Sequence, residues 1–156
     1  MKRKTLLIAA SFIAVTITIT SCKKEKEKVK GCMDSKSRTY NSAAEVDDGS
    51  CAYNGKATFW VDSNSASNFA AQGIGKIKIY INGSVAGTYD FAAGIPISAP
   101  TSCGESGYVS VNLDMGGDKI TNGVVYTINN DSNDTIITSG STSLEGGVCK
   151  SIHITH

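Results

Sequence analysis

Short segments in which apolar and polar residues alternate fill the C-terminal two thirds of the chain. Between Ile77 and Ile81, isoleucines alternate with Lys78 and Tyr80, which is the period-two pattern of a strand with one buried face. Asn82-Gly83 follows at once, and this dipeptide is the strongest short hairpin signal because both turn positions need positive φ. The pattern therefore predicts a β-hairpin whose second strand begins near Val85.

Six further segments alternate in the same way or are rich in strand-forming residues. They are residues 57–61, 85–91, 109–113, 124–128, 134–138 and 151–154. Gly, Asn, Asp and Ser separate them, and residues 65–72 have room for only a turn or two of helix. Seven short strands in about 100 residues predict an all-β fold, a small seven-stranded, Ig-like β-sandwich. The polar stretch 115–123 is expected to be a long connection between two of these strands.

The N-terminus has the pattern of an export signal. Basic residues at positions 2–4 precede an uncharged run from Leu6 to Thr20, which is shorter than the about 20 residues that a membrane-spanning helix needs. The following Ile19-Thr20-Ser21-Cys22 resembles a bacterial lipobox. That resemblance implies a signal peptide at 1–21, cleavage before Cys22 and lipidation of its sulfur, with palmitate-like acyl chains as the anchor. The alternatives are a transmembrane anchor and an ordinary signal peptide.

The residues after Cys22 indicate where the protein resides. Lys23 to Lys30 is a charged run too polar to pack, so residues 22–30 are expected to form a solvated tether. The string Ser21-Cys22-Lys23-Lys24-Glu25 resembles outer-membrane lipoproteins of Bacteroidota-type bacteria. The resemblance implies a lipid anchor in the outer membrane and leaves open whether the protein faces the periplasm or the cell surface.

Charge is distributed unevenly along the chain. Residues 1–30 hold eight Lys/Arg and two Asp/Glu, whereas residues 31–156 hold seven and twelve. The part that folds is therefore acidic, the opposite of the basic face that nucleic-acid binding requires. Nucleic acid is excluded as a partner.

The cysteine count indicates disulfides. Lipidation of Cys22 leaves four cysteines, an even number in an oxidising compartment. Of the three possible pairings we favour Cys32–Cys51 and Cys103–Cys149, because each closes a loop within one structural unit. A four-cysteine zinc site is the rival, but zinc sites draw on close pairs such as C-x₂-C, and no such pair occurs here.

Residues 31–54 form a separate small unit with almost no apolar content, so we expect a disulfide-closed irregular module that acts as a spacer. Gly31-Cys32-Met33-Asp34, Tyr40-Asn41 and Asp47-Asp48-Gly49-Ser50-Cys51 resemble a short G-C-x-D…Y-N…D-D-G-S-C module of secreted and surface proteins. Calcium is the one cofactor considered, with Asp34, Asn41, Asp47 and Asp48 as oxygen ligands. The alternative is that these residues serve turns by binding their own backbone.

Residues 55–156 form the second unit, and their motifs also resemble a family. Lys56 to Trp60, Ser102-Cys103-Gly104, Gly123 to Ile128 and Gly146 to Cys149 resemble a module of Bacteroidota lipoproteins. This module is similar to transthyretin-like or carboxypeptidase-regulatory-like β-sandwiches. The resemblance supports the Cys103–Cys149 pairing and implies a non-catalytic domain.

Short matches to catalytic and modification motifs carry less weight. Gly104-Glu105-Ser106-Gly107 resembles the surroundings of a serine nucleophile, but the only histidines are His153 and His156, and a triad needs a base and an orienting carboxylate on a rigid frame. We therefore predict that the protein is not an enzyme. Asp134-Thr135-Ile136 matches an O-glycosylation signal and makes Thr135 a candidate acceptor.

Three functional hypotheses remain. The first is a binding module for a glycan, peptide or protein, with the loops 62–75 and 92–107 as its binding surface, since sandwiches carry function on loops. Trp60, Tyr80 and Tyr89 are the candidate sugar-stacking residues if they face outward; the alternative is that they form ordinary cross-strand pairs. The second is a structural or assembly lipoprotein without a small ligand, and the third is an enzyme. The sequence sets neither the ligand nor the oligomeric state.

Overall fold

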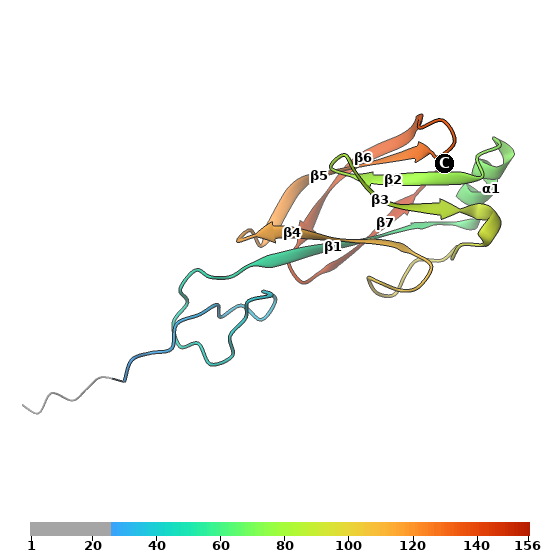
Figure 1. The fold of residues 1–156 in the computed structure, drawn as a ribbon. Coiled ribbons are helices and arrows are strands. Elements are labelled where there is room, and N and C mark those ends of the chain that lie inside the picture. The colour runs from blue at the N-terminus through green and yellow to red at the C-terminus, as the bar shows by residue number, and fades with distance from the viewer. Residues whose placement is uncertain (1–25) are drawn as a thin grey trace, which may run out of the picture.

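Two sheets stack face to face in the structure, a computed structural model that describes residues 26–156 (Figure 1). The elements in chain order are β1 (Tyr53–Val61), α1 (Ser63–Ala71), β2 (Lys76–Ile81), β3 (Ser84–Asp90), the 3₁₀ turn η1 (Phe91–Ala93), β4 (Val109–Gly116), β5 (Ile120–Asn130), β6 (Ile136–Glu145) and β7 (Cys149–Ile154). The predicted class, an all-β sandwich of seven strands, is confirmed.

The two sheets differ in size and in strand direction. The smaller sheet has the order β4-β1-β7, with β4 antiparallel and β7 parallel to the central β1. The larger sheet has the order β3-β2-β5-β6 and is antiparallel throughout. Each sheet therefore ends in two edge strands, β4 and β7 in one and β3 and β6 in the other.

The core lies between the sheets and follows the predicted alternation. The fully buried Phe59 on β1 faces the other sheet, where Ile77 and Ile79 on β2 and Ile128 on β5 are also fully buried. The rings of Phe59 and Tyr126 meet edge to face, with centroids 5.7 Å apart. Burial of these side chains is the main source of stability, at about 1.5–3 kcal/mol for each.

The predicted hairpin joins β2 to β3. Asn82 and Gly83 have φ values of 46° and 78°, the left-handed pair that a two-residue turn of this kind requires. The Asn82 side chain also accepts a hydrogen bond from the backbone N–H of Val125 at 3.0 Å. The turn is thus fixed both by its own backbone and by the neighbouring β5.

Residues 62–75 contain a nine-residue helix, α1, which is longer than the turn or two of helix expected at 65–72. The Asp62 carboxylate caps α1 by accepting the backbone N–H of Ser65 at 2.6 Å, which satisfies one of the free donors at the helix start. Phe69 is fully buried and stacks on Phe91 and on His156, with ring centroids 5.2 and 4.5 Å away. This tertiary packing stabilises a helix whose sequence has weak periodicity.

The predicted bounds of β5 and β6 were wrong. β4 continues to Gly116 and β5 begins at Ile120, so the long connection expected at 115–123 is a short turn. β6 reaches from Ile136 to Glu145, well beyond the predicted end at 138. The additional strand residues are mainly Ser, Thr, Asn and Gly, and they are held by the ladder between β5 and β6. Leu144, near the end of β6, is the large apolar residue among them that reaches the core.

The three aromatic residues proposed as one sugar-stacking face do not share a surface. Tyr89 is buried, 3% exposed, in the core. Tyr80 alternates with the buried Ile79 and Ile81 and so faces outward from the larger sheet. Trp60 faces outward from the smaller sheet, where it stacks on His153 with ring centroids 4.0 Å apart. A shared stacking face is therefore contradicted.

Candidate functional site

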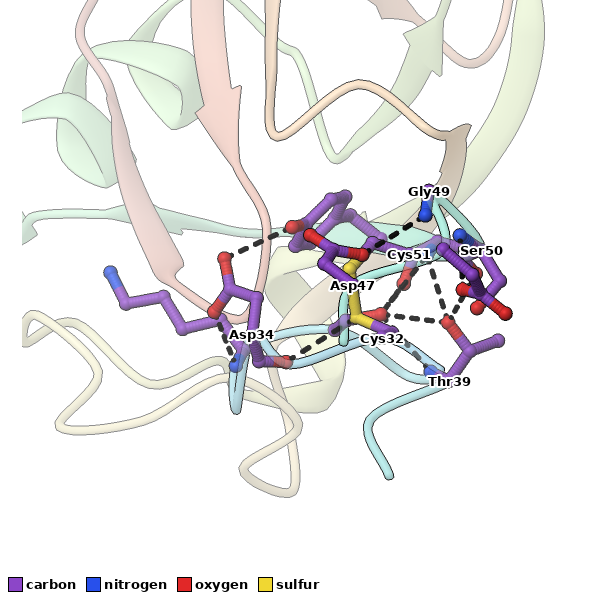
Figure 2. Close-up of a disulfide and its surroundings, with 12 residues drawn as sticks. Cys32, Asp34, Thr39, Asp47, Gly49, Ser50 and Cys51 are labelled. Atoms are coloured by element: carbon purple, nitrogen blue, oxygen red, sulfur yellow. Dashed lines mark hydrogen bonds between the residues drawn. A yellow bond between two sulfur atoms is a disulfide. The ribbon is translucent and has the colours of Figure 1, made fainter. Parts of the chain in front are cut away.

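The segment before β1 is closed by a disulfide between Cys32 and Cys51 (Figure 2), as predicted. Isolated bridges pair Lys30 with Val46 and Cys32 with Tyr40. Cys32 is fully buried although the segment has almost no core. We call residues 30–52 the Cys module.

Four side chains proposed as calcium ligands are each bonded to the backbone two residues ahead. The bonds run from Lys36 N–H to Asp34 at 2.9 Å, and from Ala43 N–H to Asn41, Gly49 N–H to Asp47 and Ser50 N–H to Asp48 at 3.0 Å each. These are the local turns that Asp and Asn favour. Within residues 26–156 no group of three or more His, Cys, Asp or Glu side chains is placed to hold a metal. Calcium binding here stays a prediction.

Charged side chains join the Cys module to the end of the sandwich. Three ion pairs cross the boundary: Lys36 with Glu145 at 2.7 Å, Arg38 with Asp114 at 2.9 Å and Lys119 with Asp34 at 2.7 Å. Asp114 and Lys119 flank the β4–β5 turn, and Glu145 ends β6. The Cys module is therefore docked on the sandwich rather than only connected to it, which the spacer hypothesis did not anticipate.

Asp34 is the centre of this junction (Figure 2). Its carboxylate accepts hydrogen bonds from Lys119, from the backbone N–H of Lys36 and from the hydroxyl of Tyr53. These donors, the Lys119 ammonium first, lower the pKa of Asp34 to about 2. Because this pKa is lowered, the Asp34 carboxylate is fully charged at pH values above the ordinary pKa of aspartate. Its contribution to the junction is lost as the pH falls toward 2.

The second predicted disulfide, Cys103–Cys149, is also confirmed. It fixes the loop between η1 and β4 to β7, across the outer face of the smaller sheet. Gly104 N–H donates to the Ser110 hydroxyl at 3.2 Å, and the neighbouring Thr58 is fully buried although it alternates with the core-facing residues. The loop thus covers part of this face.

The end of the sandwich opposite the Cys module carries α1 and η1 (Figure 1), and two adjoining hollows lie beside these elements. One, of about 390 Å³, lies between the end of α1 and η1, and the other, of about 250 Å³, lies beside the β5–β6 loop; Gly73 and Gly75 line both. The first also has Phe91 and Ala92 in its wall. Residues of the predicted binding segment 62–75 therefore line both hollows, whereas Ala92 is the one residue of the segment 92–107 in their walls. We call this surface the far end.

The charged groups that line the far end are in ion pairs. Lys76, which lines the second hollow, pairs with Asp90 at 2.8 Å. Asp131, in the same hollow, pairs with Lys78 at 3.0 Å. The hydrogen bond and the charge of each carboxylate raise the pKa of its lysine. A ligand here meets glycine backbone, one aromatic wall and neutralised pairs rather than a strong net charge.

Glu105 of the nucleophile-like motif and His153 each have other partners. Glu105 accepts from the backbone N–H of Thr101 at 2.7 Å. His153 pairs with Asp62 at 3.1 Å beneath the stacked Trp60. Among residues 26–156 no hydrogen bond joins His153, Glu105 and Ser106 to one another. That the protein is not an enzyme stays a prediction.

The remaining predicted modification sites are Thr135 and Cys22. Thr135 is exposed in the β5–β6 loop, where its hydroxyl donates to the Asn133 side chain at 2.7 Å. Cys22 lies outside the described residues. Within residues 26–156 no helix has the length and apolar character needed to cross a membrane.

No protein-family model, curated protein or solved structure matches the chain. The fold and the sites described above therefore rest on the chain's own residues and geometry.

Proposed function

We propose that the chain is a lipid-anchored protein of the bacterial outer membrane whose β-sandwich is a non-enzymatic binding module. The observation that carries the binding role is the far end, where α1, η1 and the β5–β6 loop surround two joined hollows on a rigid sandwich. Loops held by a rigid frame are where sandwich proteins place their binding residues. The ligand classes that fit are a neutral glycan or peptide segment, because the charges there are paired.

The docked Cys module supports the same role. The lipid anchor precedes residue 30 in the chain, and the Cys module joins the end of the sandwich opposite the hollows (Figure 1). Ion pairs on both sides of this junction limit how far the sandwich can turn relative to the Cys module. The far end is then directed away from the Cys module of the same chain.

The test of the binding role uses Gly75, which lines both hollows. A Cβ at Gly75 would meet nothing within 4 Å, so Gly75→Tyr should fold normally and fill the hollows. Against a ligand identified by screening the detergent-purified full chain on glycan and peptide arrays, we expect about tenfold weaker binding or more.

The matched control is Gly117→Tyr at the opposite end of the sandwich, where a Cβ meets its nearest neighbour at an ordinary 3.7 Å. This variant should bind as the wild type does. Arrays without a reproducible ligand, or equal losses in the two variants, would count against the far end as the binding surface.

A further inference from the structure

The four edge strands of the sandwich differ in how they are protected from pairing with another chain. An exposed edge presents unpaired N–H and C=O groups, and natural proteins block such edges with bulges, charges, inward-pointing lysines or short strands. On β3 the register shifts opposite Ile79 and Tyr80, which leaves Ala86 as a bulge. On β4 a shift opposite Tyr53 and Asn54 leaves Met115 as a bulge, and Asp114 is held by Arg38.

The edge strand β7 is protected differently. It has only six residues, and Cys149 at its start is bonded to Cys103. Lys150 alternates in register with the core residues Ile152 and Ile154 and yet is exposed. A lysine in such an inward-facing position is one of the devices that prevent edge pairing.

The edge strand β6 has one bulge, at Ile137 near its start, where the pairing with β5 shifts between Ile128 and Asn129. Beyond this bulge it has none of these protections. Residues 138–144 read Thr-Ser-Gly-Ser-Thr-Ser-Leu, with no charged residue and no proline. Their pairing with β5 runs without a shift from Thr138 to Thr142. On the outer side of this stretch no backbone-to-backbone hydrogen bond is made by any described residue. Ser139, Ser141 and Ser143 are exposed along it.

We propose that β6 is an interaction edge at which a second copy of this chain adds antiparallel to the first, joining two four-stranded sheets into one of eight strands. In a two-fold antiparallel pairing, each residue lies opposite a residue of the same stretch in the other copy. A charged residue near the centre of the strand would therefore face a like charge across the axis. β6 meets this condition because its only charged residue, Glu145, is at the strand end. With Ser141 on the axis, Ser139 lies opposite Ser143 and Thr138 opposite Leu144.

The pairing has a geometric consequence for the assembly. Because antiparallel addition reverses one copy relative to the other, the two Cys modules lie at opposite ends of the dimer. The inference deepens the proposed function, since it names a partner for the sandwich, and it rests on that proposal only in treating the sandwich as an interaction module. Self-association through β6 and ligand binding at the far end are measured on different variants, so either can fail alone.

The test is sedimentation equilibrium of the full chain in density-matched detergent. The wild type should show a concentration-dependent dimer. Ser139→Lys combined with Ser141→Lys introduces like charges across the axis, and we expect the dissociation constant to rise about tenfold or more. The matched control, Ser84→Lys with Thr88→Lys, adds the same charge to the exposed positions of β3 and should leave the dimer unchanged.

A second variant keeps the test independent of folding effects. Ser141→Cys should form an oxidised dimer in membranes, whereas Thr88→Cys on β3 should not. A wild type that stays monomeric at all concentrations would overturn the proposal. So would a dimer that only the β3 lysines weaken, or cross-linking of Ser141→Cys to a different protein and not to itself.

Discussion

Replacing Cys103 and Cys149 together by alanine should lower the free energy of unfolding by about 4 kcal/mol. The bond joins residues 46 apart, and closing a loop of that length removes about this much chain entropy from the unfolded state. This loss is a large part of the free energy of unfolding of a typical domain, which is about 5–15 kcal/mol. It also frees the loop that covers the outer face of the smaller sheet. Denaturant unfolding of the full chain, followed by the fluorescence of the single tryptophan, Trp60, measures the effect.

The matched control replaces Cys32 and Cys51, which close the Cys module and are 19 residues apart. This change should loosen the Cys module and shift the unfolding midpoint reported by Trp60 much less, because Trp60 is on the sandwich. An unchanged Trp60 midpoint in the Cys103→Ala, Cys149→Ala variant would contradict the account of the covering loop.

Tyr89→Phe should destabilise the sandwich by about 3 kcal/mol. The buried Tyr89 hydroxyl donates to the Phe59 carbonyl oxygen and accepts from the Val109 N–H at 2.9 Å, so one side chain of β3 joins two strands of the other sheet. Removing it leaves a buried acceptor and a buried donor without partners, at about 1–3 kcal/mol each. Tyr80→Phe removes an exposed hydroxyl bonded to Asp134 and should cost well under 1 kcal/mol.

Tyr89 should also make the free energy of unfolding fall at alkaline pH. Burial raises the pKa of Tyr89 to about 12, compared with about 10 for a tyrosine in the unfolded chain. The folded state therefore holds the Tyr89 proton more tightly than the unfolded state does. The stabilisation that results, on the order of 2 kcal/mol, is complete below pH 10 and is lost as the pH rises toward 12. Urea unfolding at pH 9 and pH 11.5 should show this loss in the wild type and in Tyr80→Phe. Equal alkaline losses in Tyr89→Phe and the wild type would rule out Tyr89 as the source.

Local patterns predicted the parts of the fold in which local sequence and tertiary structure agree. The alternating isoleucines of β2 predict a strand with one buried face, and Asn82-Gly83 predicts the hairpin turn that follows. With Cys22 set aside as the predicted lipidation site, four cysteines remain, and two lie in each unit of the chain. This distribution predicted both disulfides, Cys32–Cys51 and Cys103–Cys149.

The sequence was less informative where a neighbouring strand, not a buried face, holds the backbone. The Ser, Thr and Gly of β6 carry almost no hydrophobic pattern, so its extension from Ser139 to Glu145 depends on the ladder with β5. The helix α1 was underestimated for a similar reason, because Phe69 gains its packing from Phe91 and His156, which lie far along the chain.

The candidate sites show the same division. That Asp and Asn side chains of the Cys module serve turns is a local property, and it was among the alternatives considered. The ion pairs of Lys36, Arg38 and Lys119 join residues between 76 and 109 positions apart, and no spacing rule links such residues. The only sequence signal for these ion pairs was the presence of charged residues on both sides of the predicted boundary between the Cys module and the sandwich.

Lipid attachment at Cys22 is the central claim of this account, because the proposed location and the proposed role at the outer membrane both depend on it. The most direct measurement is metabolic labelling with an alkynyl palmitate analogue in a bacterium that processes lipoproteins, comparing the wild-type chain with Cys22→Ser. The account predicts label on the wild type in the membrane fraction and none on Cys22→Ser. A wild type that carries no label, or equal labelling of the two chains, would contradict it.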